Sequence, residues 1–273
     1  MNKRVSAIAH KVVMLVLMVC ILFPFLWLLV SSFKPERDIV SWPPTLFSEG
    51  YTTANYKRVF DVIPLLYNIR NTVIFAGGVV LFQLVFNTLA GYAMARLDFK
   101  GKKVMSYLIL MAMMIPFQVY MIPLYFMEFN MGLLDTFWGL ILPRMAAPFG
   151  IFLMRASFVG LPRGLEEAAR IDGCSEIGIF FRIMLPLVKP GLLTMAIITL
   201  MHNWNDLLYP MMLTSNPRMR TLSAGLALFT GENIIAYGPV LAGTVISIIP
   251  LLVIYVFAQR YFISGVAMSG MKE

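Results

Sequence analysis

The chain has 273 residues, of which 59% are hydrophobic and 13% are charged, and its formal net charge is +8. Its mean hydropathy is +0.79. Soluble domains carry roughly 25% charged residues, and a soluble fold of this size has too little interior to hide so much apolar surface. These values exclude an intrinsically disordered chain and disfavour a soluble enzyme. They predict an integral membrane protein.

Six segments, taken in chain order, have the length and composition of transmembrane helices. A bilayer core about 30 Å thick needs roughly 20 apolar residues per helix. The first three segments contain no charged residue, whereas the fourth contains Arg144 and the fifth contains Asp206. The predicted spans are residues 12–33, 71–95, 104–127, 136–154 and 190–209, with a sixth inside 233–259. The expected fold is all-α, a polytopic membrane protein with six transmembrane helices, and the first span is interpreted as an uncleaved anchor because it exceeds the apolar run of a signal peptide.

The positions of Lys and Arg predict the orientation of these spans, because cytoplasmic loops carry an excess of both. Four groups lie on one side: Lys3, Arg4 and Lys11; Arg96, Lys100, Lys102 and Lys103; Arg155, Arg163, Arg170, Arg182 and Lys189; Arg260 and Lys272. The loop between the third and fourth spans holds Glu128 and Asp135 and no basic residue. Both termini are therefore expected in the cytoplasm, with a cytoplasmic loop at 155–189 and external loops at 34–70 and 210–238. The expected partner of such a charge pattern is the lipid bilayer and not a nucleic acid.

Several kinds of chemistry are absent from the sequence. It contains no G-x-x-x-x-G-K-[ST] phosphate-binding pattern, no HExxH and no G-x-S-x-G nucleophile elbow. No catalytic residue and no metal site are predicted. Ion-coupled carriers usually keep carboxylates or broken helices inside the membrane as ion sites, and Asp206 is the only candidate carboxylate. Energy for any pumping is therefore expected to come from another chain.

The cytoplasmic loop contains a predicted short helix at 164–171, which follows a proline at 162 and stops at Gly173. The pairs Arg163–Glu167 and Glu166–Arg170 have the i, i+4 spacing of surface ion pairs. One interpretation is a solvated amphipathic helix. The other is a docking helix, on which Glu167 meets a basic residue of a partner in a desolvated charge pair.

A defined series of residues in this loop decides between those interpretations. It consists of Glu167-Ala168-Ala169, Asp172-Gly173, Phe180, Ile183, Leu185-Pro186 and Pro190. The series resembles the EAA motif of binding-protein-dependent ABC importer permeases, whose coupling helix sits in a cleft of a cytoplasmic ATPase and transmits its movement. The resemblance implies that residues 1–273 form a single transmembrane permease domain. It assigns coupling to the ATPase to Glu167, Ala168, Ala169, Asp172, Gly173 and Pro186.

A second resemblance lies in the fifth span, where Trp204-Asn205-Asp206 is similar to the W-N-[DE] element of carbohydrate importers of the maltose-permease type. Residues 265–272 resemble the tail of the second permease subunit of that group, except that Glu273 stands where glycine is common. The candidates for the translocation path are Asn203, Trp204, Asn205 and Asp206, together with Gln118 in the third span. Alternatively, these side chains only bond neighbouring helices and fix the bundle. Arg144 is assigned a structural or outer-gate role.

Together the resemblances imply a non-catalytic permease subunit of an ATP-driven carbohydrate importer, with oligosaccharides as the expected substrates, in a bacterial plasma membrane. The implied partners are a second permease subunit, two cytoplasmic ATPase subunits that bind ATP and Mg, and an extracytoplasmic sugar-binding protein. No cofactor is expected in this chain. The alternatives are a permease for a non-sugar solute, an ion-coupled secondary carrier, and a membrane scaffold without transport activity. The sequence does not name the sugar.

Overall fold

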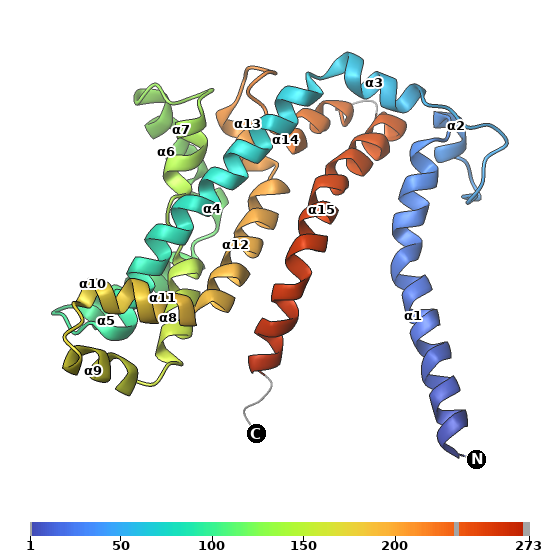
Figure 1. Ribbon diagram of the computed structural model, residues 1–273. Coiled ribbons are helices and arrows are strands. Elements are labelled where there is room, and N and C mark those ends of the chain that lie inside the picture. The colour runs from blue at the N-terminus through green and yellow to red at the C-terminus, as the bar shows by residue number, and fades with distance from the viewer. Residues whose placement is uncertain (1, 232–234, 270–273) are drawn as a thin grey trace. The chain divides into compact units, whose positions relative to one another are not determined.

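A computed structural model describes the backbone of residues 2–231 and 235–269, and side chains within 10–231 and 235–256. The regular elements of these residues are all helical (Figure 1), and the one β-type pairing among them is an isolated bridge between Thr230 and Ile235. The predicted all-α membrane fold is therefore confirmed. The chain forms two compact units: Met1–Leu65 with Gly225–Pro250, and Leu66–Ala224 with Leu251–Glu273. The single permease domain expected over residues 1–273 stays a prediction.

Among the described residues, three helices are long and apolar enough to cross a bilayer without interruption, and three pairs of helices reach that length only together. The uninterrupted candidates are His10–Ser32 within α1 (Asn2–Ser32), α4 (Leu65–Arg96) and Tyr237–Val256 within α15 (Tyr237–Ser269). The pairs are α5 (Lys102–Met114) with α6 (Phe117–Asn130), Phe137–Arg144 with α8 (Pro148–Val159), and Glu176–Leu187 with α12 (Lys189–Trp204). Phe137–Arg144 consists of α7 (Phe137–Ile141) and the 3₁₀ helix η1 (Leu142–Arg144). The six predicted spans correspond to these three helices and three pairs.

Prolines explain where the pairs break. The α5–α6 pair bends by 97°, and there Pro116 precedes α6 while Ile115 before it has extended dihedral angles. A proline forces this geometry on the residue before it because its ring crowds the preceding backbone. Pro148 likewise opens α8 after a bend of 46°, and Pro190 lies in the first turn of α12 after a bend of 72°. A proline is tolerated at the start of a helix, where its missing N–H has no partner to lose.

Several helices extend beyond the predicted spans or lie within the predicted loops. Helix α4 begins at Leu65 and not at residue 71, and the predicted external loop 34–70 also contains α2 (Glu36–Ile39) and α3 (Ala54–Val62). The predicted loop 210–238 contains most of α13 (Leu208–Leu213), then α14 (Leu222–Leu226) and the 3₁₀ helix η3 (Ala227–Phe229). The predicted limit follows the charge of Arg70, but the helix continues past it to Leu65. In this first part of α4, Asn68 and Asn71 are buried and donate hydrogen bonds to backbone carbonyls of residues 217–220.

In the first unit, one carboxylate fixes the start of α15. Glu36 accepts hydrogen bonds from the backbone N–H groups of Tyr237 and Gly238, at 2.7 and 2.9 Å. The first N–H groups of a helix have no partner within it, and a negative charge suits that end of the helix dipole. Asn55 of α3 donates to the carbonyls of Ser32 and Lys34, at 2.9 and 2.8 Å. These contacts hold α2 and α3 against the ends of two apolar helices.

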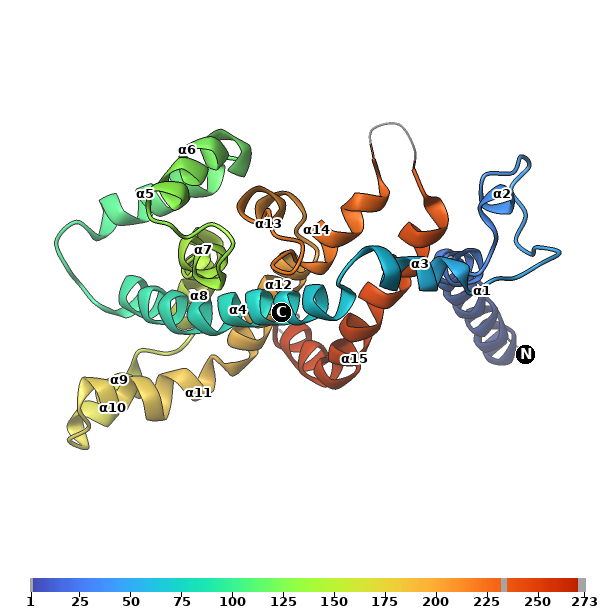
Figure 2. The same ribbon diagram turned by 90° about the horizontal axis from the view of Figure 1, so that it is seen from above.

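In the second unit, two buried clusters lie toward opposite ends of α4. One contains Tyr92, Met154, Phe158, Ile179 and Phe180, and the other contains Phe75, Leu140, Ile141, Tyr209 and Leu213. In Figure 1, α9 (Gly164–Ile171) and α10 (Glu176–Ile179) lie near the end of α4 that carries the first cluster, and α7 and α13 lie near its other end. Figure 2 shows the same unit along the perpendicular direction, with α7 and α8 between α4 and the α5–α6 pair. Helix α4 is thus the element that both clusters share.

Helices α4 and α8 approach closely at Gly91. A β-carbon there would lie 2.6 Å from Cβ of Met154 and 2.8 Å from the backbone nitrogen of Arg155. Atoms in a packed interior cannot yield by that much without moving a helix. The absence of a side chain at Gly91 therefore allows the crossing.

Replacing Gly91 with alanine should force α4 and α8 apart and lower the free energy of unfolding by about 1–3 kcal/mol. Gly77→Ala is the matched control, since a β-carbon at Gly77 in the same helix meets no atom within 4 Å. Thermal unfolding of the purified chain in detergent measures both effects. Equal unfolding temperatures for the two variants would contradict the close crossing.

Candidate functional site

The predicted coupling helix exists as α9, and its two faces differ. Glu166 and Ala169 are buried, whereas Glu167 and Ala168 are exposed. Because residues three apart lie on the same side of a helix, Glu166 and Ala169 form its inner face. Glu167 and Ala168 are thus available to a partner. Ala169, which the sequence also assigned to docking, packs in the core of the second unit, and its docking role stays a prediction.

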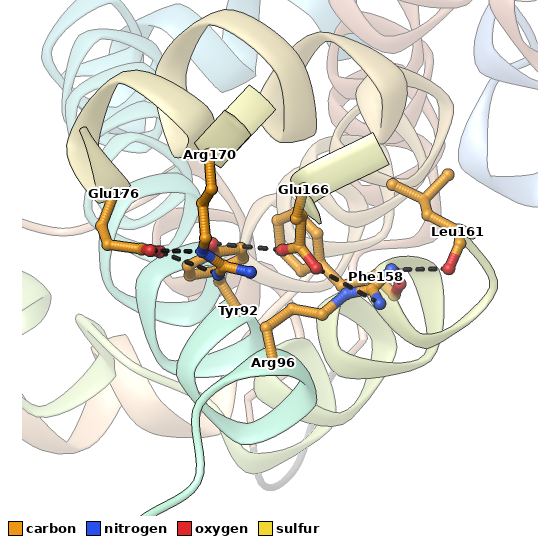
Figure 3. Close-up of polar contacts among 7 residues, drawn as sticks. All are labelled: Tyr92, Arg96, Phe158, Leu161, Glu166, Arg170 and Glu176. Atoms are coloured by element: carbon orange, nitrogen blue, oxygen red, sulfur yellow. Dashed lines mark hydrogen bonds and ion pairs between the residues drawn. The ribbon is translucent and has the colours of Figure 1, made fainter. Parts of the chain in front are cut away.

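Glu166 joins α9 to the end of α4 (Figure 3). The hydroxyl of Tyr92 donates to Oε1 of Glu166 at 3.3 Å, and Nη1 of Arg96 lies 3.5 Å from Oε2. The Arg96 and Glu166 side chains are only 5% and 6% exposed. Nη2 of Arg96 also donates to the carbonyls of Phe158 and Leu161, at 2.6 and 2.7 Å. One guanidinium therefore connects α4, the last turn of α8 and α9.

A second ion pair fixes the turn that follows α9. Nε of Arg170 lies 2.6 Å from Oε1 of Glu176, and Nη2 donates to Oε2 at 3.1 Å, which is a bidentate arrangement (Figure 3). The hydrogen bond to Glu176 raises the pKa of the Arg170 guanidinium. Gly173 permits the turn because its φ is +78°, a conformation that residues with a side chain rarely adopt. The predicted pairing of Glu166 with Arg170 is wrong, since Glu166 pairs with Arg96 of α4 and Arg170 pairs with Glu176.

The surface around this turn combines charge with exposed apolar side chains. Asp172, Gly173 and Pro186 are exposed. A hollow is lined by Gly173, Cys174, Ser175, Ile177, Gly178, Phe181 and Arg182. Exposed apolar side chains next to a rigid helix are typical of a surface that another protein covers. Among the predicted coupling residues, Gly173 lines this hollow, and all but Ala169 are exposed.

The segment after the turn is helical but not uniformly α-helical. A π-helical stretch, η2 (Phe180–Met184), follows α10, and α11 (Leu185–Leu187) follows it directly. Pro186 therefore lies inside a helical segment and does not itself reverse the chain. The direction changes at Val188, between α11 and α12, by 72°.

A second polar cluster surrounds Arg144 on η1. Nη2 of Arg144 lies 2.5 Å from Oδ2 of Asp206, and Nη1 donates to Oδ1 of Asn203 at 2.7 Å. The guanidinium also lies 3.8 Å from the centre of the Tyr209 ring, a cation–π contact. The side chains of Arg144 and Asp206 are 17% and 14% exposed. A charge that is so little exposed to water is stable only when it is paired. The carboxylate of Asp206, the amide of Asn203 and the ring of Tyr209 together stabilise the Arg144 guanidinium.

Hydrogen bonds extend this cluster to α4. Nε2 of Gln83 donates to the backbone carbonyl of Arg144 at 2.9 Å, and Oε1 of Gln83 accepts from Thr199 at 3.0 Å. The Tyr209 hydroxyl donates to the carbonyl of Gly139 at 3.0 Å. The cluster therefore connects α4, α7, η1, α12 and α13 through side chains that bond helices to one another.

The predicted path residues separate into two groups. Asn203 and Asp206 converge on Arg144, and the neighbouring Trp204 is buried, only 2% exposed. Asn205 is exposed and donates to the carbonyl of Met201 in its own helix, and Gln118 is exposed on α6. The first group fits the interpretation that these polar side chains fix the bundle. A role of any of the five in the translocation path stays a prediction.

The sequence did not identify Tyr92, Arg96 and Glu166 as one site. The signal that could have found them is the position of Arg96, a basic residue one helical turn from a tyrosine at the end of a span.

The similarity of the 265–272 tail to the second permease subunit concerns side chains that lie outside the described residues.

Comparison with known proteins identifies the family. Residues 87–267 match the model of the family described as binding-protein-dependent transport system inner membrane component. The chain belongs to this family. The resemblance of loop 155–189 to importer permeases is therefore confirmed, and the chain is a membrane-embedded permease.

Relatives of this permease support the assignment over nearly the whole chain. It is 39% identical over 256 residues to the arabinooligosaccharides transport system permease protein AraQ of Halalkalibacterium halodurans, which covers 92% of this chain and 91% of that protein. It is 34% identical to AraQ of Bacillus subtilis, covering 98% and 96% of the two chains. It is 32% identical to the trehalose/maltose transport system permease protein MalG of Thermococcus litoralis, covering 99% and 97%.

A solved structure shares the fold of this permease. A chain of a bacterial ABC transporter involved in the import of the acidic polysaccharide alginate matches with a TM-score of 0.77 at 24% identity. The match covers 96% of this chain and 98% of that chain. The described chain therefore shares its overall helical fold with that transporter chain.

Replacing Asp206 with asparagine should leave Arg144 without its counter-charge and lower the free energy of unfolding by about 1–3 kcal/mol. Asn205→Ala is the matched control, because that exposed amide bonds only its own helix, and its effect should stay within about 0.5 kcal/mol. Thermal unfolding in detergent measures both. The structural interpretation fails if Asp206→Asn unfolds at the same temperature as Asn205→Ala.

Proposed function

We propose that this permease is the non-catalytic membrane subunit of an ATP-driven importer of carbohydrates, with oligosaccharides as the substrate class. The observation that carries the proposal is the braced helix α9, which buries Glu166 and presents Glu167 and Ala168 to solvent. A rigid helix with an exposed carboxylate suits a partner that must push on the bundle. The names of the relatives, which include arabinooligosaccharide and trehalose/maltose systems, support the substrate class.

The partners follow from what this chain lacks and from what it exposes. Its sequence has no phosphate-binding loop, so ATP and Mg are assigned to two cytoplasmic ATPase subunits that dock on α9 and the hollow beside it. A second permease subunit supplies the other half of the path, and an extracytoplasmic binding protein delivers the sugar. Both termini are assigned to the cytoplasmic side of a bacterial plasma membrane.

The mechanism is alternating access. When the ATPase subunits close on ATP, they move α9 and the coupling helix of the second permease subunit toward each other. The bundle then opens outward to accept sugar. Hydrolysis and release of the products reverse the movement. The residues of this chain supply the mechanical link and part of the wall, and bond making and breaking take place on the ATPase subunits.

The arrangement around Asp206 disfavours an ion-coupled carrier. Ion-coupled carriers usually keep an intramembrane carboxylate that exchanges its proton or ion during transport. Asp206 is instead held by Arg144 at 2.5 Å. A carboxylate with so close a cation is poorly suited to bind and release another one in each cycle.

Uptake of radiolabelled arabino-oligosaccharide into proteoliposomes tests the proposal, with the complete complex, external binding protein and internal ATP. Uptake should require ATP and the binding protein. Glu167→Ala should reduce uptake at limiting ATPase subunit by at least about tenfold, because truncating one side of a desolvated charge pair weakens an interface strongly.

Asp98→Ala is the matched control, since this carboxylate lies in another predicted cytoplasmic loop, is 89% exposed and pairs only with Lys102. It should transport as the unaltered complex does. Uptake that continues without ATP and without the partner chains would identify an ion-coupled carrier instead. Normal uptake by Glu167→Ala would remove the proposed role of α9.

A further inference from the structure

We propose that Glu166 is a positioning residue that conveys the movement of α9 to α4, while its neighbour Glu167 serves docking alone. The inference rests on the proposed function, and it assigns separate tasks to two adjacent glutamates. Docking decides whether the ATPase subunits bind. Glu166 decides whether their movement reaches the membrane helices.

The geometry separates the two side chains. Glu166 points toward Tyr92 and Arg96, which hold its two oxygens (Figure 3). Glu167 is exposed. Tyr92 and Arg96 are one turn apart on α4 and therefore share one side of that helix. Two attachments at different heights on α4 resist rotation of α9 as well as its separation, which a single contact would not do.

The attachment is also difficult to replace by another contact. Arg96 is buried, and its Nη2 donors are used by the carbonyls of Phe158 and Leu161 at the end of α8. A buried guanidinium that loses its carboxylate keeps the cost of desolvation without the compensating charge. The pair is therefore maintained when α9 is pushed or pulled.

Helix α4 can carry the movement across the bundle. Of the candidate spans in the described part of the second unit, α4 is uninterrupted, and the other three are bent pairs. Along its length α4 bonds η1 through Gln83 and residues 217–220 through Asn68 and Asn71. A displacement at Tyr92 and Arg96 thus reaches the Arg144 cluster through one continuous helix, whereas the bent pairs can absorb a displacement at their breaks.

The test compares Glu166→Gln with Glu167→Gln in the full complex with its binding protein, using the same uptake of arabino-oligosaccharide into proteoliposomes. Glu166→Gln should bind the ATPase subunits with unchanged affinity and hydrolyse ATP, but the sugar transported per ATP should fall by roughly 2- to 30-fold. Glu167→Gln should lose ATPase subunits on purification, and the complexes that remain should transport as much sugar per ATP as the unaltered complex does. If Glu166 only stabilised the fold, Glu166→Gln would lower ATP hydrolysis and sugar uptake together, and the sugar transported per ATP would stay unchanged.

Tyr92→Phe provides a milder variant that keeps the ion pair and the packing of the ring on Phe158 and Phe180, at centroid distances of 5.2 and 4.9 Å. The sugar that Tyr92→Phe transports per ATP should lie between the values of the unaltered complex and of Glu166→Gln. If Glu166→Gln does not assemble, Tyr92→Phe alone tests the inference.

An unchanged amount of sugar transported per ATP in both Tyr92→Phe and any assembled Glu166→Gln would overturn the inference. So would loss of the ATPase subunits from Glu166→Gln to the same degree as from Glu167→Gln. Absence of ATP-driven uptake by the unaltered complex would overturn the proposed function, and the inference with it.

Discussion

A buried positive charge requires a partner, and this constraint organises the second unit of the permease. Arg96 lies at one end of α4, and Arg144 bonds Gln83 nearer its middle. Each arginine pairs with one carboxylate, Arg96 with Glu166 and Arg144 with Asp206. Each guanidinium also bonds an additional group, the carbonyls of residues 158 and 161 or the amide of Asn203. Because an unpaired charge costs several kcal/mol away from water, these two arginines determine which segments must remain together.

The prolines divide the bundle into a rigid part and segments with breaks. Helix α4 is continuous, and Gly91 allows α8 to pack directly on it. The other spans of this unit change direction near Pro116, Pro148 and Pro190. A transporter that alternates between two open states needs both kinds of element, since movement must be transmitted in one place and accommodated in another.

Much of the fold could be predicted from the sequence, because charge-free runs of about 20 residues are typical of helices that cross a bilayer. The limits of the spans were less predictable, since a charged residue such as Arg70 ends an apolar run without ending the helix that contains it. The site was predicted only in part. The motif located α9 and Glu167, but the partner of Glu166 lies 70 residues earlier, at Arg96. Spacing along one helix therefore favoured Arg170, and long-range pairing of this kind leaves no periodic signal in a single sequence.

The attachment of residues 217–220 to α4 has a consequence for how these permeases diverge. Asn68 and Asn71 bond the carbonyl oxygens of Pro217, Arg218 and Arg220 and none of their side chains. Every amino acid possesses a carbonyl oxygen, so substitutions in this segment preserve its anchorage. Evolution can therefore vary the chemistry displayed there, one residue at a time, while the path of the backbone is inherited unchanged.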